Sequence, residues 1–191
     1  MRPDWPLLAA VLLGGAAFAV LLMDAPLLGH DWLSLFARQP HDILALPANV
    51  PYPPWVIPIL LRPLTVFPVP VSVALIKGLT LACVTLISYR EGRRAFPHNR
   101  LVAVVAVLLA AVNPLTWGML WLGQIDMLVL IGVIIMPYGV PFVLAKPQIG
   151  MWVFLNSRRD MLIAGAVLAL SLVIWGFWPS VALNPAIFNP H

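Results

Sequence analysis

Uninterrupted apolar runs, each about as long as a bilayer is thick, constrain the fold of this chain more than any other feature of its sequence. The first run, residues 5–23, contains no charged side chain and would measure about 28 Å as an α-helix. Charged residues make up 9% of the chain and hydrophobic residues 62%, whereas a soluble domain carries about 25% charged residues. Such a composition cannot cover a fold with a polar surface, so we expect an integral membrane protein built from α-helices.

The apolar pattern predicts an all-α, polytopic bundle that forms a single transmembrane domain over residues 1–191. Residues 55–67 are too few to cross a bilayer and contain Pro58 and Pro63, so we expect an interfacial or re-entrant segment there. About five runs are long enough to span: residues 5–23, 69–89, 101–121, 125–145 and 161–178.

The fourth of these runs has two interpretations. Residues 125–145 could cross as one helix that bends at Pro137 and Pro141. The stretch between these prolines could instead form the tip of a shallow hairpin, which would bring Gln124 and Lys146 together near the outer face. Both arrangements return the chain to the same side afterwards, so the charge pattern does not choose between them.

Basic residues predict the orientation of the bundle. Those in the connection at residues 90–100 fall on the same side as Arg2, Arg158 and Arg159 if the spans alternate. This side is cytoplasmic by the positive-inside rule, and the loop at residues 24–54 is then outside. We therefore expect a multi-pass protein of a bacterial cell membrane with a cytoplasmic N-terminus. Orientation also accounts for the net charge of +4, so nucleic acid is not an expected partner.

Polar groups that could carry chemistry are few in this background. His30, His41 and Asp42 are too loosely spaced for a recognised metal site, so we expect neither a metal nor a cofactor. Lys77 lies inside an apolar run, and a cation within a membrane needs an anionic partner such as a phosphodiester. Four further features stand out: Asp31, the Tyr-Pro-Pro-Trp run at residues 52–55, the Gly-Gln-Ile-Asp run at residues 123–126, and the Lys-Pro-Gln run at residues 146–148.

The order of these features resembles that in the integral-membrane glycosyltransferases of the GT-C superfamily, particularly the branch that transfers mannose or other sugars from polyprenyl-phosphate carriers. In that family an aspartate in an external loop follows the first span. A Tyr-Pro-Pro run, a Pro-Leu pair, a Gly-Gln turn and a Lys-Pro-Gln element come after it. The matching positions here are Asp31 and residues 52–54, 63–64, 123–124 and 146–148. Such enzymes usually have more helices, so this chain resembles a shortened member.

The resemblance implies that a sugar is transferred from a polyprenyl-phosphate donor to an acceptor on the outer face of the membrane. Asp31 would act as the general base that accepts the proton of the acceptor hydroxyl. Lys146 is the first candidate for binding the donor phosphate, and Lys77 and Arg62 are the other two. The full set of substrate-binding residues that we expect is Tyr52, Lys77, Gln124, Lys146 and Gln148.

Each of these residues also has a purely structural interpretation. Asp31 and Asp126 are of a type favoured at helix caps, and Lys146 could extend to cytoplasmic lipid head groups. The chain would then be a non-catalytic accessory subunit of a larger membrane protein complex, which its short length and broken helices favour. A transporter is less favoured because the sequence shows no inverted repeat. The expected partners are membrane lipids together with either the donor or such a complex.

Overall fold

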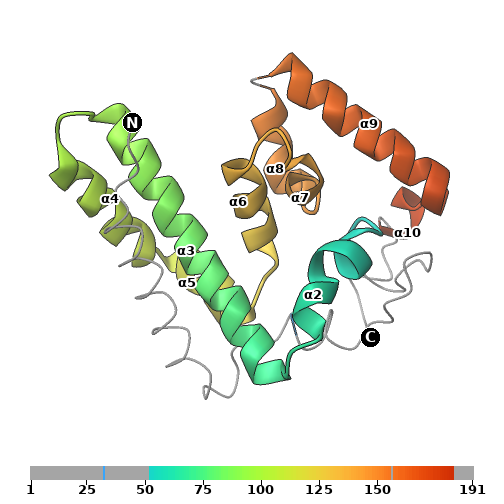
Figure 1. Ribbon diagram of the computed structural model, residues 1–191, viewed down its shortest axis with the longest axis horizontal. Helices are drawn as coiled ribbons and strands as arrows, with labels where there is room; N and C mark the ends of the chain where they lie inside the picture. Colours follow the sequence, from blue (N-terminus) through green and yellow to red (C-terminus); the bar gives the residue numbers. More distant parts are fainter. Residues whose placement is uncertain (1–31, 33–51, 156, 183–191) are drawn as a thin grey trace.

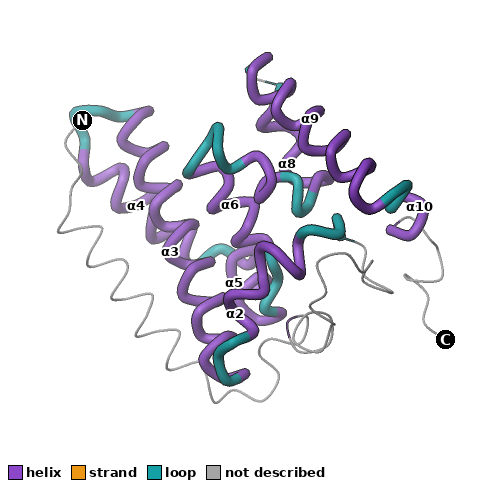
Figure 2. Tube along the Cα trace, turned by 45° about the vertical axis from the view of Figure 1, so that its right-hand side comes forward, coloured by secondary structure: helices purple, strands orange, loops and turns teal. Residues whose placement is uncertain are grey.

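The computed structural model describes residues 32, 52–155 and 157–182, and the regular elements in these ranges are all helical. Figure 1 shows two long helices, α3 and α9, with the short helices α6, α7 and α8 between them. Helix α4 lies beside α3 in both Figure 1 and Figure 2. The prediction of an all-α chain is therefore confirmed.

Helix α3 (Val69–Ala95) is the longest described element, with 27 residues. Proline is tolerated in its first turn, because the backbone N–H that proline lacks would have no partner within the helix there. Arg93 and Arg94 in its last turn complement the helix dipole. The helix therefore continues beyond residue 89, where the sequence predicts the end of the second span. By length and composition, α3 could cross a bilayer on its own.

The predicted span at residues 101–121 is divided into two helices, α4 (Arg100–Ala111) and α5 (Pro114–Leu122). Their axes differ by 49°. The bend follows from Asn113, whose side chain accepts a hydrogen bond from the Leu115 amide at 2.8 Å, and from the proline that begins α5. The bent pair together is long and apolar enough to form a second crossing.

Residues 125–145 do not form one helix, and the first interpretation of this run is wrong. Helix α6 (Asp126–Ile134) ends early, and after a turn α7 (Val140–Val143) packs back against it. A Cβ atom at Gly139 would lie 2.0 Å from the Gly132 carbonyl oxygen, so the two helices approach more closely than any side chain allows. The hairpin interpretation is the one that the structure supports.

This close approach predicts that Gly139→Ala disrupts the hairpin. All three atoms nearest to the added methyl group belong to the backbone of Gly132, so no side chain can move to relieve the clash. We expect the variant to lose about 1–3 kcal/mol of stability or more, measured by unfolding in mild detergent. Gly165→Ala on α9 (Arg158–Trp175) is the matched control, because a Cβ there meets nothing within 4 Å. Equal stability of the two variants would contradict the prediction.

The remaining described elements are short or lie at the C-terminal end. Helix α8 (Pro147–Phe154) precedes α9, and α10 (Pro179–Ala182) follows it. The predicted fifth span corresponds to α9, which begins earlier than residue 161 with the charged residues of its first turn. The predicted interfacial segment consists of a π-helical turn, η2 (Val56–Leu61), and α2 (Arg62–Thr65).

The number of membrane crossings remains a prediction. Within the described ranges α3 could span alone, and α4 with α5 could supply a second crossing if the bent pair is one span. The predicted first span, residues 5–23, lies outside the described residues, as does most of the loop at residues 24–54. Over the described residues the structure is all-helical and has one apolar helix of spanning length.

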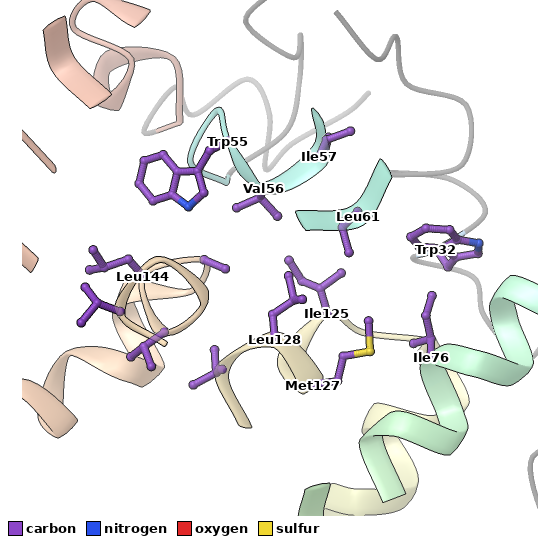
Figure 3. Packing of buried hydrophobic residues seen from close by; sticks show 14 of the residues in the cluster. Trp32, Trp55, Val56, Ile57, Leu61, Ile76, Ile125, Met127, Leu128 and Leu144 are labelled. Carbon is purple, nitrogen blue, oxygen red and sulfur yellow. The ribbon is translucent and has the colours of Figure 1, made fainter. Parts of the chain in front are cut away.

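The buried core lies where η2 meets the beginning of α6. Val56 and Leu61 face Ile125 and Leu128 in Figure 3, and all four are buried. Trp32 extends this core onto α3, where its indole Nε1 donates a hydrogen bond of 2.8 Å to Ser72 Oγ. Segments far apart in the sequence are thereby packed around the N-terminus of α6.

Candidate functional site

A buried ion pair joins the first residue of α6 to the residue that precedes α8. Lys146 Nζ lies 2.5 Å from Asp126 Oδ1, and 9% and 12% of the two side-chain surfaces remain exposed, respectively. That oxygen has no hydrogen-bond partner within the described part of the chain, so the contact is a close ion pair without hydrogen-bond alignment. The pair places opposite charges in an otherwise apolar interior.

Local backbone structure places Asp126 at this site. The left-handed conformation of Gly123, with φ of 64°, ends α5 and turns the chain into α6. Asp126 is then the first residue of α6, where a negative charge is favoured by the helix dipole. The helix cap is Ile125, and no side chain caps it by a hydrogen bond. Asp126 therefore contacts Lys146, and the expectation that it caps the helix is wrong.

Lys146 is positioned by the proline that follows it. Its backbone lies outside the helical region, with φ of −131° and ψ of 79°, because a following proline disfavours the helical conformation. Its carbonyl oxygen accepts hydrogen bonds from the amides of Ile149 and Gly150, both at 3.0 Å, which starts α8. A cation at a helix N-terminus is disfavoured by the dipole, so the carboxylate of Asp126 compensates for the position of this ammonium group.

The Tyr-Pro-Pro-Trp run covers the same site from a distant part of the chain. The Lys146 ammonium lies 5.8 Å from the centre of the Tyr52 ring, within the range of a cation–π contact. Trp55 donates a hydrogen bond of 3.1 Å from its indole Nε1 to the carbonyl oxygen of Pro141, on α7. The run is therefore attached to α7, the part of the hairpin that directly precedes Lys146 in the chain.

Three of the sequence motifs thus meet at one place. Tyr52, Asp126 and Lys146 come from three separate motifs, and each contributes one side chain to the cluster. We call these three residues the Lys146 cluster. The simple five-span interpretation would separate the two charged members by a full crossing, and it is wrong on this point. Asp126 is the member that the sequence did not identify as a ligand-binding residue.

The other predicted site residues occupy different positions. Gln124 is half-buried in the turn between α5 and α6, next but one to Asp126 in the chain. Gln148 is exposed in the first turn of α8. Lys77 is buried on α3, one residue after Ile76, whose side chain lies close to Met127 in Figure 3. Helix α3 packs against α6, the helix that carries Asp126, as well as against α4 and α5.

The predicted general base, Asp31, lies outside the described residues. Its neighbour in the chain, Trp32, is fully buried and bonded to Ser72 on α3. Ser72 and Lys77 belong to the buried side of the same helix. Trp32 is thus attached to the helix that contains Lys77.

Burial makes the ion pair energetically sensitive. Removing two charges from water is costly, and their attraction offsets that cost when they are close together. Deleting one partner leaves the other charge buried and uncompensated, which typically costs about 3–5 kcal/mol. An ammonium group has three N–H donors, so Lys146 can contact Asp126 and still bind an oxygen of an added anion.

Comparison with protein-family models, with curated proteins and with solved structures finds no match to this chain.

Proposed function

We propose that this chain is a multi-pass membrane protein that transfers a sugar from a polyprenyl-phosphate donor to an acceptor on the outer face of the membrane. The observation that carries the proposal is the Lys146 cluster, in which two motifs typical of GT-C glycosyltransferases supply Tyr52 and Lys146. Asp126, two residues after the Gly-Gln turn, completes the cluster through its ion pair with Lys146. The donor has a phosphate at the membrane boundary and a tail in the bilayer. A buried cation between apolar helices suits this donor, because the cation can bind the phosphate and the apolar surroundings can accept the tail.

In this proposal Lys146 binds the donor phosphate while Asp126 keeps the ammonium group in position. The ion pair neutralises the cation before the donor arrives, and the phosphate then shares the remaining N–H donors. The aromatic ring of Tyr52 excludes water from one side of the ammonium group, which strengthens its attraction to an anion. Lys77, buried on α3, which packs against α6, is proposed to supply a second positive charge to the donor.

The chemical step follows from the donor. An oxygen of the acceptor hydroxyl attacks the anomeric carbon, the bond between that carbon and the phosphate oxygen breaks, and the polyprenyl phosphate leaves. Asp31 accepts the proton of the attacking hydroxyl. Lys146 stabilises the negative charge that grows on the departing phosphate. Gln124 and Gln148 are proposed to bind the substrate through their amide groups.

The experiment that tests donor binding uses a variant with no unpaired charge. In Asp126→Leu/Lys146→Met both charges are replaced by apolar side chains of similar size, which a buried pair usually tolerates. We expect the dissociation constant for polyprenyl phosphate to rise by about 10-fold or more, because a charged hydrogen bond is lost. Glu91→Gln, at an exposed position near the end of α3, is the control and should bind as the parent does. Unchanged binding by the double variant would exclude Lys146 as the phosphate ligand.

A second candidate function is a non-catalytic accessory subunit of a membrane complex. It is favoured by one observation: the charges of Lys146 and Asp126 compensate each other, so the ion pair can act as a clasp between α6 and α8. The double variant distinguishes the two functions, because a clasp can be replaced by apolar packing with no effect on polyprenyl phosphate. Loss of sugar transfer in a folded double variant supports the enzyme. Normal assembly into a complex with no transfer by the parent chain supports the subunit.

A further inference from the structure

Two groups of arginines lie at helix ends along one side of the structure. The first group occupies the C-terminal part of α3 and the first position of α4, and the second occupies the first two positions of α9. The C-terminal end of α3 and the beginning of α9 both lie along the upper edge of Figure 1, and Figure 2 shows them on the same side. We call these six side chains the arginine face: Arg90, Arg93, Arg94, Arg100, Arg158 and Arg159.

The arginine face is accessible and carries excess positive charge. Five of its six members are exposed, and Arg93 is half-buried. Arg94 makes an ion pair of 3.8 Å with Glu91, but both side chains are mostly exposed, so the pair contributes little. The six guanidinium groups outnumber the two carboxylates of the same helix ends, which belong to Glu91 and Asp160.

Helix stability does not account for three of these arginines. Arg100, Arg158 and Arg159 occupy the first positions of α4 and α9, where the helix dipole disfavours a positive charge. Three amides at these helix ends, those of Leu101, Val102 and Asp160, already donate to the side chains of Asn99 and Ser157. The three arginine side chains are exposed, so their guanidinium groups can reach an anion outside the protein.

Exposed apolar side chains lie directly beside the arginines. Phe96 is 53% exposed in the connection between α3 and α4, and Leu101 is 69% exposed next to Arg100. Leu162 on α9 is 75% exposed, one turn after Arg158. Guanidinium groups beside exposed apolar side chains suit the boundary of a bilayer, where cations meet phosphates and apolar groups meet acyl chains.

We propose that the arginine face binds the head groups of anionic phospholipids. A guanidinium group offers paired N–H donors that match two phosphate oxygens, which distinguishes it from a point charge such as lysine. Clusters of arginine next to a membrane-spanning helix are attracted to anionic lipid. The proposal requires that the chain lies in a membrane, and it is independent of sugar transfer and of the Lys146 cluster.

The test measures thermal unfolding of the full chain in mild detergent with added lipid. We expect phosphatidylglycerol to raise the Tm by roughly 5 °C or more and phosphatidylcholine to leave it nearly unchanged. Arg90→Gln/Arg94→Gln should lose part of this shift, and replacing all four arginines of the α3 and α4 group should remove most of it. The four-residue variant includes the half-buried Arg93, so its loss of shift could reflect a change in the fold. The two-residue variant replaces exposed side chains alone and should keep the fold, so it tests the proposal in that case.

Arg62→Gln is the matched control, because Arg62 is exposed on α2, in the lower part of Figure 1 away from the arginine face. It should keep the full shift. An equal shift with phosphatidylcholine, or an undiminished shift in the arginine variants, would overturn the proposal. An equal shift with free glycerol phosphate would also overturn it, since the face would then recognise a soluble anion rather than a lipid surface.

Discussion

Asp31→Asn is expected to reduce sugar transfer by about 100-fold while binding of polyprenyl phosphate is unchanged. An amide has nearly the same shape as a carboxylate but cannot accept the proton of an attacking hydroxyl at neutral pH. The substitution therefore removes the proposed base and leaves the phosphate ligand in place. The measurement is transfer of labelled sugar from a polyprenyl-phosphate donor, with donor binding determined on the same preparation.

The matched control for this prediction is Asp42→Asn, a second aspartate in the same predicted outer loop. It should transfer sugar at the parent rate, because the resemblance to GT-C enzymes assigns it no role. Equal rates for the parent and Asp31→Asn would exclude Asp31 as the base. Equal losses in both aspartate variants would indicate a general effect of charge in the loop, and that result would also contradict the assignment.

The helical elements of the structure were largely predictable from the sequence. The scarcity of charge predicts helices, and the apolar run from residue 69 corresponds to α3. The break inside residues 101–121 was not predicted, although Asn113 as a side-chain cap and Pro114 favour the start of a new helix there. Its signal is local, because capping acts between residues close together in the chain.

The geometry of the Lys146 cluster was not predictable from local chemistry. It depends on the hairpin, and the hairpin depends on the contact between Gly132 on α6 and Gly139, the residue before α7. The apolar character of residues 125–145 fits a single crossing equally well. Pro137 and Pro141 were the signal for a hairpin, but charge could not decide between the alternatives. The pairing of Asp126 with Lys146 follows once the chain folds back.

The contact between Lys146 and Tyr52 was even less predictable from the sequence than the ion pair. It joins the Tyr-Pro-Pro-Trp run to the hairpin through packing of η2 on α6 and through the bond from Trp55 to Pro141. Such contacts are set by tertiary structure, and no periodicity encodes them. The resemblance to GT-C enzymes suggested that these motifs act together, whereas the physical pattern of the residues suggested separate helix caps and anchors.

Asp126→Leu and Lys146→Met are each expected to lower the free energy of unfolding by about 3–5 kcal/mol, because each leaves a buried charge without its partner. The double variant should recover most of this loss, since two apolar side chains need no desolvation of charge. Unfolding of all four proteins in mild detergent gives the coupling energy between the two residues.

The sign of that coupling determines what the ion pair does. If the two single losses add up in the double variant, the side chains are energetically independent, and the contact of 2.5 Å between Lys146 and Asp126 contributes nothing to the fold. If the double variant is as stable as the parent, the charges are not needed to hold α6 and α8 together. A chain that retains a costly buried pair in that case retains it for a ligand, and the same folded variant should then fail to bind polyprenyl phosphate. Recovery of stability with full binding would leave the pair as a replaceable clasp and would favour the accessory subunit.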